Sequence, residues 1–172
     1  CDESFVLTQR NLVRTHIQPL FVLGLPRSGK SMIEKFLSFH QDVQAAGEVG
    51  VTEFAGELDI SGKKVFFPFW LPDSNPNTLQ EIVDQYEKRM TRDIAAGKYV
   101  VDTMPGNAFY LGLLLKLYPN AKIIYIQRDP LDLGLALYLK YFVSKHYYSN
   151  DLRTIGQYIR LYQSIMDYWM TM

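Results

Sequence analysis

Apolar and polar positions along the chain form blocks that predict strands followed by helices. Short, nearly continuous apolar runs occupy residues 20–24, 98–102 and 121–126, as is typical of strands buried in a parallel sheet. Between these runs, apolar residues recur at intervals of three and four positions, which predicts amphipathic helices. The alternation predicts an α/β fold of three layers, in which helices flank a central parallel sheet.

The predicted helices fill most of the chain between the strands. The first follows residue 31 and ends near His40. The second begins at Asn77 or Thr78, either of which would cap it, and extends to Gly97. Its apolar stripe is Ile82, Tyr86, Met90 and Ile94. Further helices are predicted over residues 107–118, over residues 132–142 and from Asp151 onwards.

Other segments are less regular. Residues 1–19 predict a lead-in helix or the remnant of a preceding segment, and residues 51–58 predict a short helix. Residues 61–76 contain three prolines and an aromatic cluster, which predicts a loop or flap. The last helix carries an apolar face formed by Leu152, Ile155, Ile159, Tyr162, Met166 and Trp169. We expect this face to pack against a missing C-terminal segment or against a second chain in a homodimer.

Three polar segments follow the predicted strands, at residues 24–31, 102–107 and 127–132. Ligands of parallel sheets bind at the carboxyl ends of the strands. We therefore expect these three segments to share one site.

The segment at residues 24–31, Gly-Leu-Pro-Arg-Ser-Gly-Lys-Ser, predicts a phosphorylated ligand. A loop between a strand and a helix turns backbone N–H groups towards an anion, and the helix dipole adds positive potential. Arg27 and Lys30 add two cations. The segment matches the nucleotide-triphosphate loop G-x-x-x-x-G-K-S and also contains Pro-Arg-Ser-Gly, the core of a sulfotransferase loop. A tight turn without a ligand is a third interpretation, so the loop alone leaves the ligand open.

Composition narrows the class of protein. The chain of 172 residues is long enough for one domain with a core, and its formal net charge of zero gives no indication of nucleic acid or an anionic membrane as a general partner. No apolar run reaches the ~18 residues of a membrane span, and no segment has the pattern of a signal peptide. Cys1 is the single cysteine, which excludes an internal disulfide and favours a cytoplasmic location.

Four segments together resemble the PAPS-dependent sulfotransferase superfamily, where PAPS is 3′-phosphoadenosine 5′-phosphosulfate. They are Phe-Val-Leu-Gly-Leu-Pro-Arg-Ser-Gly at 21–29, Ala-Gly-Glu at 46–48, Asp-Thr-Met-Pro-Gly-Asn at 102–107 and Ile-Ile-Tyr-Ile-Gln-Arg-Asp-Pro-Leu-Asp at 123–132. The resemblance covers about residues 19–169. It is strongest to the bacterial branch often fused to tetratricopeptide repeats, which is itself similar to protein-tyrosine sulfotransferases.

This resemblance implies a single sulfotransferase-like domain over residues 1–172 that lacks the family's C-terminal segment. It implies PAPS as the sulfuryl donor and PAP, adenosine 3′,5′-bisphosphate, as the product. The acceptor would be a hydroxyl or amine of a small molecule, glycan or peptide. The aromatic segments 66–70 and 141–148 are candidates for the acceptor pocket.

The resemblance also implies roles for individual residues. The 5′-phosphosulfate would be held by Arg27, Ser28, Gly29, Lys30 and Ser31, and the 3′-phosphate by Arg128. Glu48 would be the general base that takes the acceptor's proton, while Arg27 and Lys30 stabilise the developing charge. No metal is expected, because the protein supplies the cations. The histidines His16, His40 and His146 are expected at the surface.

Three positions depart from the family pattern. Lys30 stands where Thr or Ser is usual, Thr103 where the bacterial branch has Lys, and Ala136 where a Ser helps to bind the 3′-phosphate. We expect Lys30 to supply the cation missing at Thr103, with both positions facing the phosphosulfate.

Other interpretations stay open. One is a kinase or ATPase in which residues 24–31 bind a nucleotide triphosphate and Asp102 binds Mg²⁺. Another is a catalytically inactive PAPS-binding module. If the family resemblance is set aside, Arg128 is interpreted as the partner of Asp129 in a local ion pair.

Overall fold

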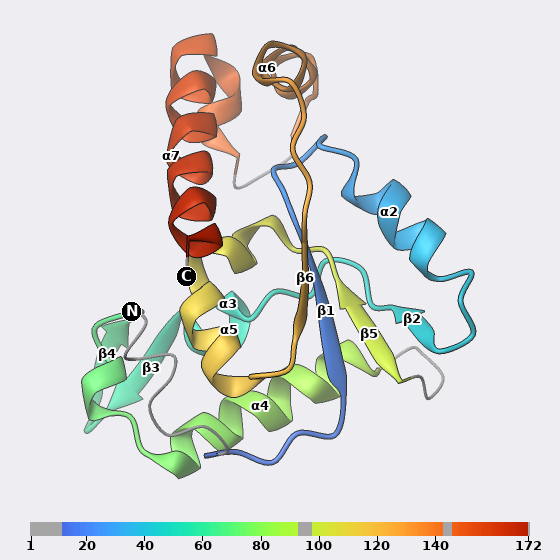
Figure 1. Cartoon of the computed structure of the whole chain (residues 1–172). Coiled ribbons are helices and arrows are strands. Elements are labelled where there is room, and N and C mark those ends of the chain that lie inside the picture. Colours follow the sequence, from blue (N-terminus) through green and yellow to red (C-terminus); the bar gives the residue numbers. More distant parts are fainter. Residues whose placement is uncertain (1–11, 93–97, 143–145, 172) are drawn as a thin grey trace.

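The computed structural model describes residues 12–92, 98–142 and 146–171. Its centre is a parallel sheet of four strands with helices on both faces (Figure 1), which confirms the predicted fold class. The strands are β1 (Gln18–Leu23), β2 (Val43–Ala45), β5 (Tyr99–Asp102) and β6 (Lys122–Tyr125), in the order β2-β5-β1-β6. The three predicted strands are confirmed, and β2, with only three residues, was not foreseen.

Parallel pairing brings the carboxyl ends of all four strands to one edge of the sheet. Phe21 of β1 lies opposite Asp102 of β5, and Leu23 lies opposite Tyr125 of β6. The chain leaves β1 through α2 (Lys30–Leu37) to reach β2 beyond β5, whereas it leaves β5 to reach β6 on the other side of β1. Connections that diverge in this way leave a crevice at the carboxyl edge, where ligands of α/β sheets bind.

The core lies on both faces of β1, which explains its continuous apolar run. Phe21 and Leu23 belong to the larger core, which contains buried residues of α4 (Pro76–Met90), α5 (Leu111–Leu117) and α7 (Leu152–Met170). Leu20 and Val22 face the other way, where α2 packs through Ile33 and Leu37.

A hairpin replaces part of the predicted loop. After α3 (Thr52–Ala55) the chain forms β3 (Glu57–Ile60) and β4 (Lys63–Phe66), which pair in antiparallel fashion, followed by η1 (Leu71–Asp73). The prediction of a helix over 51–58 was therefore wrong beyond residue 55, and the loop over 61–76 was wrong in part. The reason is the Ser61-Gly62 turn, whose φ values of 54° and 80° suit a tight hairpin connection.

Helix boundaries differ from the predicted ones because of caps. Asn75, and neither Asn77 nor Thr78, caps α4: its side chain accepts the N–H of Thr78 at 3.0 Å, with Pro76 in the first turn. The stripe residues Ile82, Tyr86 and Met90 are buried as predicted, whereas Ile94 and Gly97 lie outside the described residues.

Side-chain caps also set the start of two further helices. Asp129 caps α6 (Pro130–Tyr138), which therefore begins earlier than predicted, and Asp151 caps α7. The end of α6 also lies before the predicted residue 142. The segment 107–118 is a 3-10 helix, η2 (Pro105–Tyr110), followed by α5. A short 3-10 helix, η3 (Tyr147–Asn150), precedes α7. On α7, Ile155, Ile159, Tyr162 and Met166 are buried in the larger core of this chain, while Leu152 is exposed. The expectation that this face packs against a missing segment or a second chain was therefore wrong for these four residues.

Two further observations concern the ends and the surface. Of the predicted lead-in segment, residues 1–11 lie outside the described part, and residues 12–17 form no helix. Among the described residues, no helix combines the length and apolar character that a membrane crossing requires.

Candidate functional site at the carboxyl edge of the sheet

A cavity of about 960 Å³ opens at the carboxyl edge of the sheet. Its wall contains residues 26–27 and 29–32 of the first loop and helix, Glu48 and Thr52 after β2, residues 104–106 after β5, and Arg128 after β6. The predicted convergence of the three strand-end segments on one site is thereby confirmed, with the segment after β2 added to them.

The loop after β1 is shaped by its backbone. A Cβ atom at Gly24 would lie 2.6 Å from the Ser28 hydroxyl and 3.0 Å from the Ile126 carbonyl, so the close approach of this loop to the end of β6 requires glycine. Arg27 adopts a left-handed conformation with φ of 70°, and the loop ends at Gly29, the N-terminal cap of α2. The first N–H groups of a helix have no acceptor within it. At the start of α2 those of Met32 and Ile33 donate to the Gly29 carbonyl, which leaves the N–H groups of Lys30 and Ser31 for an anion.

Ser28 leaves a donor unused in this loop. Its hydroxyl is buried and has no hydrogen-bond partner in the described part of the chain. Buried hydroxyls are usually paired, but this one does not reach the cavity: Ser28 is absent from the cavity wall, and its hydroxyl lies 2.6 Å from the place a Cβ atom on Gly24 would take. Of the predicted loop residues, Arg27, Gly29, Lys30 and Ser31 line the cavity and Ser28 does not.

Tyr162 of α7 fixes the start of this loop. Its hydroxyl accepts the N–H of Gly24 at 2.9 Å and donates to the Pro105 carbonyl at 3.2 Å.

Arg128 ties the end of β6 to the loop after β1. Its guanidinium donates to the Arg27 carbonyl at 2.8 Å and lies 3.9 Å from the Asp132 carboxylate. The alternative interpretation, an ion pair of Arg128 with Asp129, does not hold, because that carboxylate accepts the N–H groups of Leu131 and Asp132 as the cap of α6. Two arginines thus meet at the cavity, 101 residues apart in the chain.

Lys30 and Glu48 are brought together at the same wall. The Lys30 side chain is only 4% exposed, donates to the Leu25 carbonyl at 3.3 Å and lies 3.8 Å from the Glu48 carboxylate. Burial lowers the pKa of Lys30 from its ordinary value, and the negative charges of Glu48 and Glu34 oppose this shift. Glu48 is 53% exposed, so its carboxylate is accessible from the cavity.

Asp102, in contrast, is engaged completely in the fold. It is fully buried, and its carboxylate accepts the N–H groups of Val49, Gly50 and Met104, the Tyr86 hydroxyl and the Asn107 amide. These five donors occupy the lone pairs of both oxygens. The Mg²⁺ role that the kinase interpretation gives to Asp102 therefore does not fit this residue.

The three departures from the family pattern occupy different places. Lys30 lies in the cavity wall, whereas Thr103 is buried and donates its N–H to the Gly47 carbonyl at 2.9 Å. The expectation that both positions face one ligand was therefore wrong for Thr103, which does not line the cavity. Ala136 is partly buried on α6. Lys140, which the sequence analysis missed, stands four residues after Ala136 and lines the cavity. Because α6 ends at Tyr138, Lys140 lies beyond the helix, and helical spacing from Ala136 gave no signal for it in the sequence.

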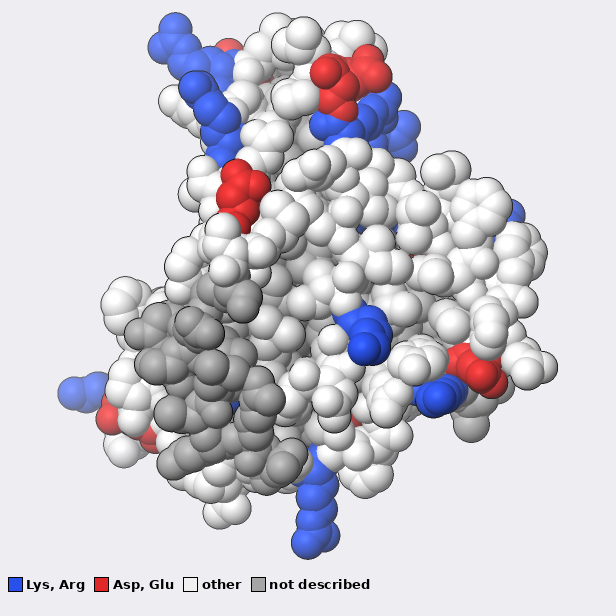
Figure 2. Space-filling model, in the orientation of Figure 1, with Lys and Arg blue, Asp and Glu red and all other residues white. Residues whose placement is uncertain are grey.

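Charge and aromatic rings define the character of the cavity. Among the described residues, four cations, Arg27, Lys30, Arg128 and Lys140, line it against the single carboxylate of Glu48. This local excess of positive charge contrasts with the neutral chain as a whole. In the view of Figure 2, basic and acidic side chains gather over α6 and the loop after β1, while the middle of this face is largely uncharged.

One of the two aromatic segments reaches the cavity. Phe142, His146 and Tyr148 line it, with the His146 ring 4.4 Å from that of Phe142 and with Tyr148 stacked on Tyr158 of α7 at 3.9 Å. The prediction that His146 is a surface residue was therefore wrong, since it is partly buried here, while His16 and His40 are exposed as predicted. Residues 143–145 lie outside the described part.

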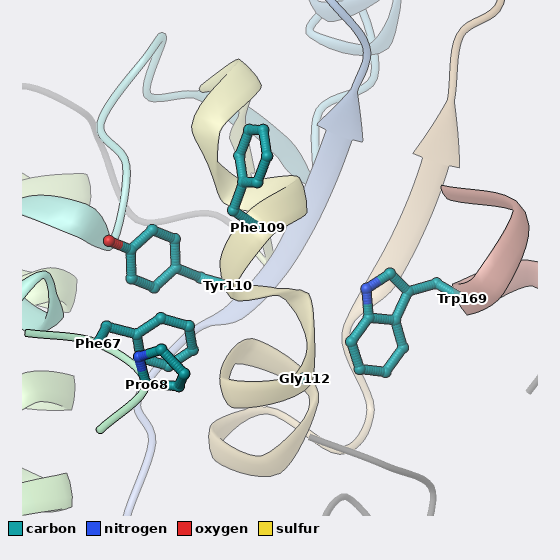
Figure 3. Close-up of a pocket in the computed structure, with 6 residues that line it drawn as sticks. All are labelled: Phe67, Pro68, Phe109, Tyr110, Gly112 and Trp169. Atoms are coloured by element: carbon teal, nitrogen blue, oxygen red, sulfur yellow. The ribbon is translucent and has the colours of Figure 1, made fainter. Parts of the chain in front are cut away.

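The other aromatic segment, 66–70, lies elsewhere. Trp70 is buried in the core with its indole N–H on the Ala55 carbonyl at 2.9 Å. Phe67 and Pro68 line a separate pocket of about 430 Å³ together with Phe109, Tyr110, Gly112 and Trp169 (Figure 3). In Figure 3 the Phe67 ring lies beside Tyr110, while Trp169 approaches from the far side of α5. None of these residues lines the larger cavity.

The fold and the site define an α/β protein with a parallel sheet and a positively charged crevice at its carboxyl edge. Residues 19–172 match the model of the sulfotransferase family, and the chain belongs to this family. It is 32% identical over 161 residues to an uncharacterized protein of Aquifex aeolicus (strain VF5), covering 88% of this chain and 21% of that protein. It is 28% identical over 119 residues to a putative protein-tyrosine sulfotransferase of Caenorhabditis briggsae, covering 65% of this chain and 40% of that protein. The chain thus spans about a fifth and two fifths of the lengths of these relatives.

Proposed function

We propose that this chain transfers the sulfuryl group of PAPS to a hydroxyl or amine of a small molecule, glycan or peptide. The observation that carries the proposal is a single cavity that joins the glycine-bounded loop after β1, the arginine after β6 and the carboxylate of Glu48. Membership of the sulfotransferase family supports the type of reaction.

The residues of the cavity suit a polyanionic donor. Arg27, Ser28, Gly29, Lys30 and Ser31 would hold the 5′-phosphosulfate, through the N–H groups at the start of α2 and through their cations. Arg128 would hold the 3′-phosphate, because its planar fork matches a phosphate in a bidentate manner. The excess of four cations over one carboxylate among the described residues of the cavity wall supports this assignment.

The proposed chemistry needs a base and positive charge. PAPS supplies an activated S–O bond, which breaks as the acceptor oxygen or nitrogen bonds to sulfur, leaving PAP. Glu48 would accept the proton that the acceptor loses, and its exposure makes it accessible to an incoming hydroxyl. Arg27 and Lys30 would stabilise the charge that develops on the leaving phosphate. The place of Lys30 in the cavity wall supports it as a cation for the donor.

Titration calorimetry with adenosine 3′,5′-bisphosphate, beside ADP and ATP with and without Mg²⁺, tests the donor site. We expect the bisphosphate to bind without metal at least about tenfold more tightly than ADP. Arg128→Ala should remove this preference, while Arg89→Ala, an exposed arginine of α4, should preserve it. Binding of ATP that requires Mg²⁺, with no preference for a 3′-phosphate, would overturn the proposal.

Turnover separates an enzyme from an inactive binding module. Incubation with PAPS and a panel of phenols, alcohols, amines and tyrosine peptides should release adenosine 3′,5′-bisphosphate with at least one acceptor. Glu48→Gln should abolish release while the bisphosphate still binds. Binding of the bisphosphate without release for any acceptor would favour the inactive module.

A further inference from the structure

The peptide that precedes Glu48 is held from both sides. The N–H of Gly47 donates to the Glu34 carboxylate at 2.9 Å, and the carbonyl of Gly47 accepts the N–H of Thr103 at 2.9 Å. Glu34 lies on α2, one turn after Lys30, and Thr103 follows β5. Because both hydrogen-bonding groups of Gly47 are engaged, the direction in which the chain presents Glu48 depends on α2 and on the end of β5.

Glu34 also belongs to the charge cluster around Lys30. Lys30 and Glu34 are one turn apart on α2, and Glu48 lies 3.8 Å from Lys30. The charge of Asp102, at the end of β5, also acts on Glu34. Partial burial raises the pKa of Glu34, which the Gly47 N–H opposes, and Asp102 and Glu48 raise it further while Lys30 lowers it. A neutral glutamine would hold the same N–H without repulsion from two carboxylates. The negative charge of Glu34 is therefore not needed for the hydrogen bond alone.

We propose that Glu34 is a positioning residue for the proposed sulfuryl transfer. Its hydrogen bond to Gly47 sets the Glu48 carboxylate against Lys30, and its own carboxylate lies one helical turn after Lys30 on α2. The inference rests on the proposed function, since it presumes that Glu48 receives the acceptor's proton and that Lys30 binds the donor. The hydrogen bond and the charge can be tested separately. Glutamine at position 34 retains the acceptor atom but loses the charge, whereas alanine loses both.

The experiment compares Glu34→Gln, Glu34→Ala and, as a control, Glu81→Gln, an exposed carboxylate of α4. Each variant is titrated with adenosine 3′,5′-bisphosphate and assayed for turnover of PAPS with the acceptor found in the panel. Glu34→Ala should lower kcat by about 10-fold to 100-fold with KM for PAPS within about threefold, and Glu34→Gln should restore most of kcat.

The pH dependence tests the charge separately. Since Glu34 raises the pKa of Lys30, its neutralisation should move the loss of bisphosphate binding at alkaline pH to a lower pH in Glu34→Gln than in the parent. Glu81→Gln should not change the alkaline pH at which bisphosphate binding is lost, which is the alkaline limb of the pH profile. A purely structural role would change the melting temperature but neither the pH limb nor the division between kcat and KM.

The inference is overturned if Glu34→Ala retains the parent's kcat, or if the alkaline limb of Glu34→Gln coincides with that of the parent. These results are distinct from failure of the proposed function. That failure would show in the parent itself, as absence of bisphosphate binding or of turnover.

Discussion

Two buried charges lie near the carboxyl edge of the sheet, and they differ in how many hydrogen-bond partners the fold gives them. Asp102, at the end of β5, is fully buried and accepts hydrogen bonds from five donors. Lys30, at the start of α2, is nearly as buried, yet in the described part of the chain its ammonium has one hydrogen bond and an ion pair at 3.8 Å. A buried charge with a complete set of partners holds loops together, whereas one with an incomplete set retains donors for a ligand.

The largest effect is expected at Asp102. Asp102→Ala leaves the N–H groups of Val49, Gly50 and Met104 without their acceptor, so the free energy of unfolding should fall by about 3–5 kcal/mol. Urea denaturation measures this. Asp73→Ala, an exposed carboxylate of η1, is the control. If the alanine variant does not fold, Asp102→Asn should show a smaller loss in the same direction. A loss below about 1 kcal/mol would contradict the structural role.

Lys30 should respond in the opposite manner. Lys30→Met removes a poorly paired buried charge, so the free energy of unfolding should stay constant or rise by about 1–2 kcal/mol. Affinity for adenosine 3′,5′-bisphosphate should fall about 100-fold, measured by calorimetry. Lys35→Met, an exposed lysine of the same helix, should change neither quantity appreciably. Loss of stability with unchanged affinity would place Lys30 in the same class as Asp102.

Tyr162 shows how α7 supports the site. Tyr162→Phe leaves the buried N–H of Gly24 without its acceptor, so the free energy of unfolding should fall by about 1–3 kcal/mol. Because Gly24 begins the loop after β1, we also expect the bisphosphate to bind about threefold to tenfold more weakly. Tyr118→Phe, a tyrosine that packs on Tyr86 in the core, should leave the affinity unchanged and thereby exclude a general effect of losing a buried hydroxyl.

The smallest effect concerns protons. Burial lowers the pKa of Lys30 below 10.5, against the influence of Glu48 and Glu34. Between the lowered pKa and 10.5 the unfolded chain binds more protons than the folded chain, so stability rises with pH in this window. A bound polyanion favours charged Lys30, so binding should take up a fraction of a proton as the pH rises through the lowered pKa.

Calorimetry of bisphosphate binding in buffers of different ionisation enthalpy measures this uptake. Lys30→Met should abolish it, and Lys35→Met should not. Equal uptake in the parent and in Lys30→Met would assign the proton to another group.

Much of the fold was predictable because its signals are local. The strands β1, β5 and β6 were visible as apolar runs, and the buried face of α7 was visible as a spacing of three and four residues. Element boundaries were less predictable, because the side-chain caps at Asn75 and Asp129 compete with neighbouring candidates. The β3–β4 hairpin was missed because the Ser61-Gly62 turn was assigned to a proline-rich loop.

The candidate site was predictable only in part. Residues 24–31 were recognisable from glycine, arginine and lysine between a strand and a helix, and the meeting of the strand-end segments followed from parallel strands. Lys140 was missed, since its place in the wall depends on where α6 ends. Whether the aromatic segment 66–70 or 141–148 reaches the cavity was also undecided, because both have similar composition.

The sequence by itself determined which segments are strands and helices and which loop is suited to an anion, because these properties depend on periodicity and on neighbouring residues. The tertiary structure decided that Lys30 faces Glu48, that Asp102 accepts hydrogen bonds from five donors and that Trp70 belongs to the core. These contacts join residues that lie far apart in the chain. They depend on the order of the strands and on the packing of helices over them, and local patterns contain neither.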